Sequence, residues 1–277
     1  MSTIEGDDEQ DLTRKQRREQ ARAKRRELEQ AEAASALRRT RLTQLGIVAV
    51  IVVAIVVGIV VATGGGSKKG IATNPIERNA TVGEVSSLLG GIPESGNNAL
   101  GSPTAPVTLQ YFADLQCPVC RQFTLGALKP LIESYVRPGE LRIEFHSFQT
   151  ATRDPETFRA QQVAALAAGK QQRGWYYVEL FYHQQGEEST GYVTESYLLG
   201  LARQVPGLDM GKWASDRSSP ELASSVASDE VAAKTHGFSG TPAFAIGKTG
   251  GTMQKLEYSS LTDPGSFVTA IQRLAKR

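Results

Sequence analysis

Two cysteines carry the clearest chemical signal in this sequence. Cys117 and Cys120 are the only cysteines among its 277 residues, and only Pro118 and Val119 separate them. Thiols at this spacing can close a disulfide, and one can attack a disulfide of another molecule while the other resolves the mixed disulfide that forms. The pair therefore predicts thiol–disulfide exchange.

The residues around the pair indicate how it is positioned. The segment 107–114 (VTLQYFAD) is rich in strand formers, and Pro118 suits the first position of a helix, where its missing N–H costs nothing. Cys117 is then expected near the N-cap, where free backbone N–H groups and the helix dipole lower the pKa of a thiol below its usual value of about 8.5. Neither residue between the cysteines is a cation, so we expect the helix terminus alone to lower this pKa.

A zinc site or a structural disulfide fits the pair less well than redox chemistry does. A structural zinc site requires four ligands, and His146, His183 and His236 stand apart without the spacing of a zinc site. We therefore expect no metal site and interpret His146 as a surface or satisfied histidine. A structural disulfide gains most from closing a long loop, whereas this pair encloses two residues. Chance rarely places the only two cysteines of a long chain three positions apart.

The apolar periodicity of the C-terminal part predicts the elements that hold the pair. A strand (107–114), a helix (118–136) with a kink at Pro130, and a parallel strand (141–148, LRIEFHSF) form a βαβ unit. A helical region follows, and then an antiparallel hairpin and a closing helix. The predicted helices are 155–171, 175–185, 194–205, 220–236 and 264–276, and the hairpin strands are 243–246 and 253–258.

A second motif precedes the hairpin, in the sequence Ser239-Gly240-Thr241-Pro242-Ala243. A proline that enters a strand cannot donate to the ladder, and after a glycine turn the bond before Pro242 is a candidate for the cis form. With the CPVC pair, this arrangement resembles the α/β thioredoxin-like fold, and more closely its DsbA-like branch, which has an inserted helical subdomain, here about 154–236. The segments PTAPVTLQYFADLQCPVCRQF, AALAAGKQQRGWYYVELFYHQQG and FSGTPAFAIG look like membrane-anchored DsbA-type proteins of Gram-positive, particularly actinobacterial, cells.

The resemblance implies roles for particular residues. Cys117 is the exposed nucleophile and Cys120 is the resolving thiol. Thr241 and Pro242 form the loop whose backbone pairs with an extended substrate, with a cis bond at Pro242. Pro118 and Val119 lie at the helix N-terminus, and without a histidine there we expect a disulfide less oxidising than that of the strongest family members.

Proton transfer is where the sequence departs from the family pattern. Relatives commonly have a buried carboxylate six residues before the first cysteine, and this chain has Tyr111 there. A tyrosine cannot act as a carboxylate near neutral pH. Asp114 is the remaining candidate for a proton relay, and it is interpreted equally well as a polar residue that ends the strand.

An apolar run divides the chain. Residues Leu45 to Ala62 contain no charged or strongly polar side chain, and the run from Leu42 to Thr63 is long enough to cross a hydrocarbon core of about 30 Å. About forty residues precede it, which argues against a cleaved signal peptide, and the excess of Lys and Arg on that side predicts a cytoplasmic N-terminus. The predicted parts are a charged cytoplasmic tail (1–44), a single transmembrane signal anchor (45–63), a linker (64–100) and an extracytoplasmic DsbA-like domain (101–277). Within the linker, the helical spacing of Val82, Val85, Leu88 and Leu89 predicts one short amphipathic turn that docks on the domain.

The charge distribution excludes one class of partner. The net charge is +2, and residues 1–44, with 11 basic and 9 acidic side chains, hold the whole surplus. The outer domain thus has no basic excess of the kind that nucleic-acid binding requires, so we expect no nucleic-acid partner. The basic tail is expected at the cytoplasmic membrane.

Together these observations predict a membrane-anchored enzyme that forms disulfides in exported proteins. Its substrates are exported protein thiols, and the resemblance implies a membrane redox partner of DsbB or vitamin K epoxide reductase type and no bound cofactor. Two alternatives stay open. A reductase or isomerase of the same fold would keep the pair reduced in cells, and a non-catalytic module would bind peptides or act as a chaperone at the groove of Pro242 without disulfide exchange.

Overall fold

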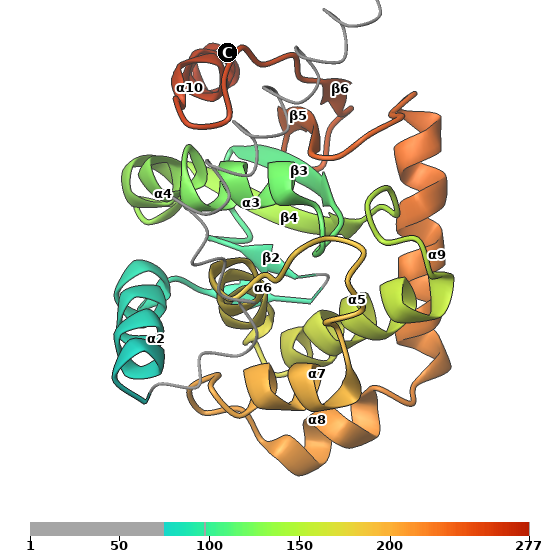
Figure 1. Ribbon diagram of the computed structural model, residues 1–277. Helices are drawn as coiled ribbons and strands as arrows, with labels where there is room; N and C mark the ends of the chain where they lie inside the picture. The colour runs from blue at the N-terminus through green and yellow to red at the C-terminus, as the bar shows by residue number, and fades with distance from the viewer. Residues whose placement is uncertain (1–74, 97, 277) are drawn as a thin grey trace, which may run out of the picture. The chain divides into compact units, whose positions relative to one another are not determined.

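A six-stranded mixed sheet lies at the centre of the structure (Figure 1). The computed structural model describes residues 75–96 and 98–276, which belong to a compact unit spanning Lys68–Arg277. The strand order is β1-β2-β4-β3-β5-β6, in which β3 (Val107–Ala113) and β4 (Leu141–Ser147) run parallel and the other neighbours run antiparallel. The parallel pair confirms the βαβ unit predicted from the sequence.

The helix between these two strands is interrupted near Gly126. A Cβ atom at Gly126 would lie 2.9 Å from the carbonyl oxygen of Leu261, so the close approach of this loop requires glycine. The interruption at Gly126 lies four residues before Pro130, and a proline cannot donate to the carbonyl at that distance, so the break agrees with the predicted effect of Pro130. The pieces are α3 (Pro118–Leu125), α4 (Leu128–Leu131) and a π-helical turn, η1 (Ile132–Val136).

Five helices follow β4 in the fully described segment 148–242, one more than the sequence predicts. The missed helix is α8, whose seven residues bury only Trp213 and therefore show no apolar periodicity. The hairpin is confirmed, but its second strand has two residues instead of six. The elements are α5 (Pro155–Gly169), α6 (Gly174–His183), α7 (Glu195–Ala202), α8 (Met210–Asp216), α9 (Pro220–Thr235), β5 (Ala243–Lys248), β6 (Gln254–Lys255) and the closing α10 (Gly265–Ala275).

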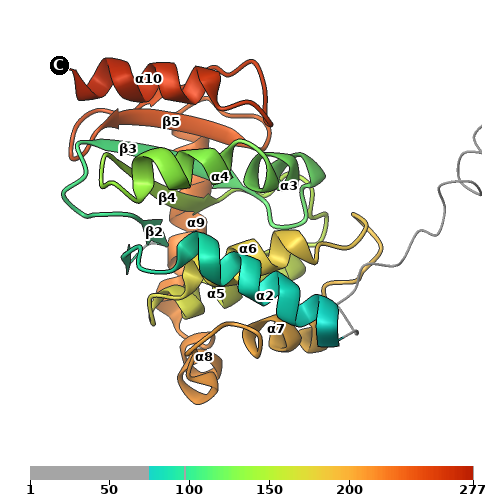
Figure 2. The same cartoon turned by 90° about the vertical axis from the view of Figure 1, so that its left-hand side faces the viewer.

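The predicted amphipathic turn within the linker 64–100 is confirmed as part of a longer helix, but the linker is more ordered than predicted because two strands follow that helix. Helix α2 (Pro75–Leu89) lies beside α6 (Figure 2), and the short strands β1 (Glu94–Ser95) and β2 (Ala99–Leu100) extend the sheet next to β4. Leu89 and Leu100 are buried in the main core. The glycine- and proline-rich composition suggested a tether, whereas tertiary contacts order this segment.

The predicted membrane span lies outside the described residues, as do the charged tail and the first part of the linker. Within residues 75–96 and 98–276, no helix is long and apolar enough to cross a bilayer. The membrane anchor therefore stays a prediction.

The two faces of the central strands pack against different partners. Tyr111 of β3 faces the main core, where it contacts Phe123 of α3, and the ring of Phe123 contacts Phe267 of α10. The next residue, Phe112, faces the opposite side and packs in a smaller cluster with Phe238, next to α9. Because successive side chains of a strand alternate between faces, β3 joins both clusters.

Candidate active site

Cys117 occupies the N-cap of α3, as the sequence predicts. Its backbone is extended (φ −71°, ψ 118°), Pro118 follows at the first helical position, and its Sγ accepts a hydrogen bond from the backbone N–H of Cys120 at 3.4 Å. The N–H of Cys117 donates to the carbonyl of Asp114 at 2.9 Å, and the side-chain amide of Gln185 donates to the carbonyl of Cys117 at 3.1 Å. The sulfur is thus fixed at the positive end of the helix.

The two sulfurs differ in access to solvent. Cys120 is completely buried, whereas Cys117 retains 5% of its surface and is followed by Val119, which is 39% exposed. Both cysteines are free thiols in this structure. Of the pair, Cys117 is therefore the thiol that an incoming molecule meets.

The two thiols also differ in acidity. A hydrogen bond with the Cys120 side chain is the largest effect on Cys117 and, against partial burial, lowers its pKa to about 6; Thr241 and backbone N–H groups of α3 contribute further. Burial raises the pKa of Cys120 well above its usual value, and Cys117 raises it further. The predicted direction is confirmed, but the helix terminus does not act alone, because the second thiol contributes most.

The loop of Thr241 and Pro242 lies against Cys117. The peptide bond between them is cis, as the resemblance implies. The thiol of Cys117 donates to the carbonyl of Thr241 at 3.5 Å, across 124 positions of sequence. Hydrogen bonding by the Thr241 side chain also lowers the pKa of both cysteines.

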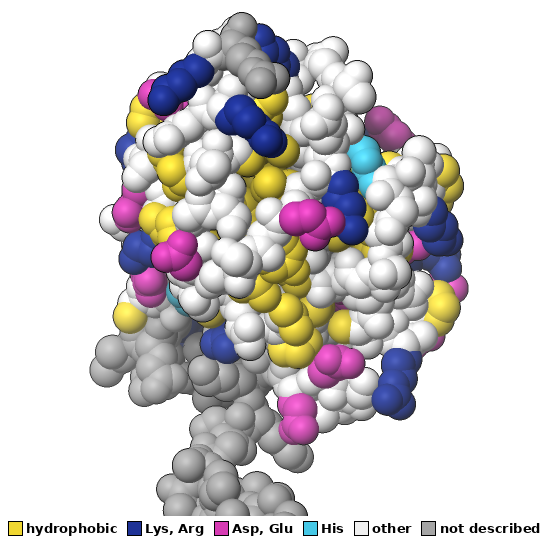
Figure 3. Space-filling model, turned by 90° about the horizontal axis from the view of Figure 1, so that it is seen from above, with side chains coloured by type: hydrophobic (Ala, Val, Ile, Leu, Met, Phe, Trp, Pro, Cys, Tyr) yellow, Lys and Arg dark blue, Asp and Glu magenta, His cyan; other side chains and the backbone are white. Residues whose placement is uncertain are grey.

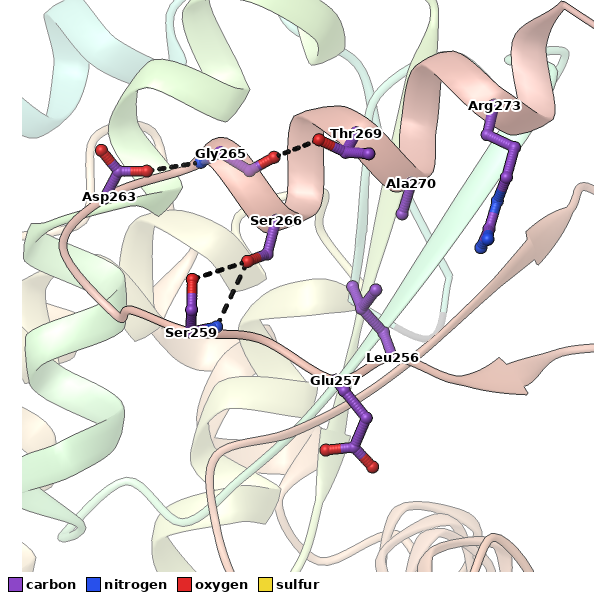
Figure 4. A pocket seen from close by; sticks show the side chains of 9 residues that line it. All are labelled: Leu256, Glu257, Ser259, Asp263, Gly265, Ser266, Thr269, Ala270 and Arg273. Atoms are coloured by element: carbon purple, nitrogen blue, oxygen red, sulfur yellow. Dashed lines mark hydrogen bonds between the residues drawn. The ribbon is translucent and has the colours of Figure 1, made fainter.

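One hollow lies beside this loop, and a second lies along α10. One, of about 290 Å³, lies between residues 237–244 and the segment from Lys255 to Tyr258. The other, of about 570 Å³, shares Leu256 and Glu257 with it and extends along α10. Its lining is largely polar, as the hydrogen-bonded pair of Ser259 and Ser266 illustrates (Figure 4). Seen from the α10 side, apolar side chains form a band between scattered charged residues (Figure 3).

Asp114 is completely buried, and both oxygens of its carboxylate accept several hydrogen bonds. Oδ2 accepts from the backbone N–H groups of residues 150–152 at 2.8 to 3.1 Å. Oδ1 accepts from the hydroxyl of Thr152 at 2.6 Å, and from the N–H of Gln116 and the amide of Gln161, both at 3.0 Å. The backbone of Asp114, rather than its carboxylate, contacts the cysteines: its carbonyl accepts from the N–H of Cys117, and a backbone hydrogen bond from Asp114 lowers the pKa of Cys120. These contacts favour a role in holding the 150–152 loop over the predicted proton relay.

Tyr111 replaces the carboxylate of the family pattern, and its hydroxyl lies beside Cys120. It donates to the carbonyl of Cys120 at 3.2 Å, and it lies 3.2 Å from Thr124 Oγ1 and 3.5 Å from the hydroxyl of Tyr182. Burial raises the pKa of both tyrosines well above the usual value. Both hydroxyls therefore stay neutral next to the buried thiol.

His146 lies on the other face of the sheet, and its Nδ1 has the hydrogen-bond partner that a satisfied histidine requires, whereas its buried Nε2 has none within the part of the chain that the structure describes. Its Nδ1 is 2.6 Å from Asp229 Oδ1, and its Nε2 is 3.6 Å from Glu144 Oε2. Among the described residues, no group of three or more His, Cys, Asp or Glu side chains is placed to hold a metal ion.

Two residues near the pair were missed at the level of the sequence. The hydroxyl of Thr150 hydrogen-bonds to that of Thr241, and the amide of Gln185 donates to the carbonyls of Leu115 and Cys117. Each is a single polar residue far along the chain from its partner. No motif or periodicity marks such positions, so only the fold reveals them.

Comparison with known proteins is consistent with this geometry. Residues 94–260 match the family model described as Thioredoxin. Two relatives named "Probable disulfide bond formation protein D" are 26% identical to this chain. The one from Bacillus anthracis aligns over 168 residues, 60% of this chain and 76% of that protein. The one from Bacillus cereus aligns over 155 residues, 55% of this chain and 70% of that protein.

Two solved structures share the fold. BdbD from Bacillus subtilis, in its oxidised form, has a TM-score of 0.55 at 19% identity, covering 67% of this chain and 99% of that chain. Wolbachia pipientis alpha-DsbA1 has a TM-score of 0.54 at 16% identity, covering 68% of this chain and 92% of that chain. At these identities the likeness concerns the fold alone.

Proposed function

This chain belongs to the thioredoxin family, and on that premise we propose that Cys117 and Cys120 are its redox-active pair. The chain is a DsbA-like thiol–disulfide oxidoreductase. The observation that carries the assignment of the pair is the contrast between Cys117, which keeps 5% of its surface and has its pKa lowered to about 6, and Cys120, which is completely buried and has its pKa raised. The thiolate is the attacking form of cysteine, and a thiol of low pKa is the better leaving group, so this contrast favours exchange at Cys117.

In the oxidising direction the pair starts as a disulfide. A substrate thiolate attacks Sγ of Cys117, the bond between the two enzyme sulfurs breaks, and Cys120 leaves as a thiolate that takes up a proton. A second substrate thiolate then attacks the substrate sulfur of the mixed disulfide and releases Cys117 as a thiolate. The substrate loses two electrons and gains a disulfide, and the enzyme gains two electrons and becomes a dithiol.

The surroundings of Cys117 support binding of an extended polypeptide. The hollow bounded by residues 237–244 starts at the loop of Thr241, whose carbonyl already contacts the sulfur. A substrate segment in this hollow would bring its thiol to Cys117 without opening the core that holds Cys120. We propose that exported proteins with free thiols are the substrates.

Location and partner are further parts of the proposal. The apolar run from Leu45 to Ala62 and the basic residues before it support an anchor that holds the catalytic domain outside the cell, where disulfides persist. Each catalytic cycle leaves the enzyme reduced, so an oxidant must regenerate it. We assign that step to a quinone-linked membrane protein of DsbB or vitamin K epoxide reductase type, which takes the two electrons; the domain itself needs no bound cofactor.

A pair of cysteine variants tests the assignment. With Cys117→Ser, oxidation of a dithiol peptide by the purified full chain is expected to stop. Cys120→Ala is expected to accumulate mixed disulfides with substrates that carry a disulfide: the Cys117 thiolate attacks that disulfide, one substrate sulfur leaves as a thiolate, and no second enzyme thiol is present to displace the substrate. The double variant Cys117→Ser/Cys120→Ala is the matched control that traps nothing. Exchange activity that survives in Cys117→Ser refutes the assignment and favours a non-catalytic binding module.

The direction of electron flow has its own test. Free thiols are alkylated in intact cells, and the redox state of the pair is read by mass spectrometry. An oxidase is expected to hold Cys117 and Cys120 mainly as a disulfide. A mainly reduced pair would instead indicate a reductase or isomerase.

A further inference from the structure

The turn that leads from β3 to Cys117 is held by side chains of the helical region after β4. The carbonyl of Ala113, the last residue of β3, accepts from the side-chain amide of Gln162 on α5 at 3.3 Å. The next carbonyl, that of Asp114, accepts from the hydroxyl of Tyr182 on α6 at 3.2 Å. Residues 49 and 68 positions away in the chain thus satisfy the backbone of this turn.

Gln185 holds two further carbonyls of the turn at once. Its side-chain amide nitrogen donates to the carbonyl of Leu115 at 2.8 Å and to the carbonyl of Cys117 at 3.1 Å. Gln185 follows the end of α6 and is only 6% exposed, so both bonds lie in the protein interior. Because a buried carbonyl that loses its donor costs free energy, removal of this amide is expected to shift the turn.

The main chain of Cys117 decides where its sulfur lies. Its N–H donates to the carbonyl of Asp114 at 2.9 Å, and its carbonyl accepts from Gln185 and, at 3.2 Å, from the N–H of Arg121 in α3. With both peptide groups fixed in this way, Sγ lies 3.4 Å from the backbone nitrogen of Cys120, from which it accepts. A hydrogen bond weakens as its distance and angle depart from the optimum, so a shift of the turn would weaken a bond that stabilises the thiolate.

The titratable groups that interact with Cys117 are neutral at neutral pH. Among the residues that the structure describes, these are Cys120 in α3, Tyr182 in α6 and Tyr258 after β6, and burial raises the pKa of each. Hydrogen bonds at the sulfur, rather than ion pairs, therefore decide the acidity of Cys117, and their geometry has a measurable effect.

We propose that Gln185 is a positioning residue for the reactive thiol: its amide holds the carbonyls of Leu115 and Cys117 and thereby keeps Sγ of Cys117 against the N-terminus of α3. Through this residue the helical region after β4 takes part in the active site. The inference deepens the proposed function, because it rests on Cys117 as the attacking thiol.

The test measures the pKa of Cys117 in the reduced full chain from the pH dependence of its alkylation by iodoacetamide, with the modified residue identified by mass spectrometry. Gln185→Met keeps the length and the approximate volume of the side chain and removes the donor. It is expected to slow alkylation at pH 5 about threefold, which corresponds to a pKa rise of about half a unit, and to leave the rate at pH 9 unchanged.

Gln204→Met is the matched control. Gln204 is also a buried glutamine whose amide nitrogen donates to two oxygens, the carbonyl of Gly200 at 3.0 Å and Oε1 of Gln184 at 3.3 Å. The control variant is expected to lower the urea midpoint of unfolding about as much as Gln185→Met does. Its alkylation profile is expected to match the wild type, because neither bond of Gln204 reaches the turn before α3.

A second measurement uses the unaltered protein and therefore does not depend on the folding of a variant. In ¹⁵N NMR spectra of the reduced full chain, the side-chain amide of Gln185 is expected to shift with pH at the midpoint that alkylation gives for Cys117. The side-chain amide of Gln204 is expected not to follow that titration.

Three results would overturn the inference: a wild-type alkylation profile in Gln185→Met, equal pKa shifts in Gln185→Met and Gln204→Met, or a Gln185 amide that does not follow the titration of Cys117. None of these depends on substrate turnover. The expected pKa shift combined with full exchange activity in Cys117→Ser would refute the proposed function and leave the positioning role of Gln185 standing.

Discussion

The two faces of strands β3 and β4 bury polar groups in opposite ways. On the α3 side, burial raises the pKa of Tyr111, and the hydroxyl is neutral with hydroxyl and carbonyl partners. On the α9 side, burial alone would lower the pKa of His146, but the hydrogen bond to Asp229 and the negative charges of Asp229 and Glu144 outweigh burial and raise it to about 9. Burial keeps a group neutral where its partners are neutral, and a buried group stays charged where opposite charges surround it.

This difference matters for the cysteines because the neutral face contains Cys120. A fixed charge next to the buried sulfur would change the pKa difference within the pair. Neutral hydroxyls leave that difference to burial and to hydrogen bonds, which is how Cys117 becomes the acidic thiol.

The largest expected effect on stability comes from removing a buried aromatic side chain on the α3 side of the sheet, where the buried polar groups are neutral. Phe123 is completely buried and its ring lies 4.6 Å from Phe244 and 4.9 Å from Tyr111, measured between centroids. Phe123→Ala is expected to lower the free energy of unfolding by about 3 to 5 kcal/mol, as measured by urea denaturation of the reduced protein. Phe238→Ala, in the smaller cluster of the other face, is the control and is expected to cost less; equal losses would contradict the comparison.

Removing a charge from the α9 side comes next. Asp229 bonds to His146 Nδ1 and also accepts from the backbone N–H of Ser147 at 2.8 Å. Asp229→Asn is expected to lower the free energy of unfolding at pH 7 by about 2 kcal/mol, because the histidine loses its nearer counter-charge. The matched control is Asp216→Asn, whose partner Lys170 is well exposed, and its expected loss is below about 1 kcal/mol. A similar loss in both variants would show that the carboxylate of Asp229 stabilises the protein no more than an exposed one does.

The same site predicts a pH dependence of stability. The pKa of His146 is about 9 in the folded protein and near 6.5 when unfolded, so the folded state binds the proton more tightly. Its contribution is fully present below about pH 6.5 and is lost as the pH rises through 9. Urea midpoints of the wild type should therefore fall more steeply between pH 7 and 9 than those of His146→Gln. Parallel curves would mean that this histidine is not protonated in the folded protein.

The smallest expected effect is on the neutral face. Tyr111→Phe removes a hydroxyl that donates to the carbonyl of Cys120, and about 1 kcal/mol of stability is expected to be lost. Tyr177→Phe, which removes a buried hydroxyl bond to the carbonyl of Leu198, is the matched control with a similar loss. Because the Tyr111 hydroxyl is neutral, the pKa of Cys117 is expected to stay near its wild-type value in both variants. A shift of a full pKa unit in Tyr111→Phe would show that this hydroxyl does affect the charge of Cys117.

Local signals predicted the parts of the site that lie close together in sequence. Pro118 after a strand marked the start of α3 and placed Cys117 at its N-cap, and the spacing of the pair indicated its chemistry. In the predicted linker, the spacing of apolar residues indicated the last turns of α2, whereas β2 was missed because its order depends on pairing with the distant strand β4. Helix α8 was missed because one buried tryptophan leaves no periodic pattern.

The sequence by itself determined the chemistry available to this protein: two thiols one helical turn apart, a proline before a strand, and a tyrosine in place of a carboxylate. Only the tertiary structure decided which neighbours those groups have. The meeting of Asp114, Thr150 and Thr241 around Cys117, and of Asp229 and Glu144 around His146, depends on contacts between residues far apart in the chain. Hydrogen bonds and pKa values respond to distances of a few ångströms, and folding alone sets those distances.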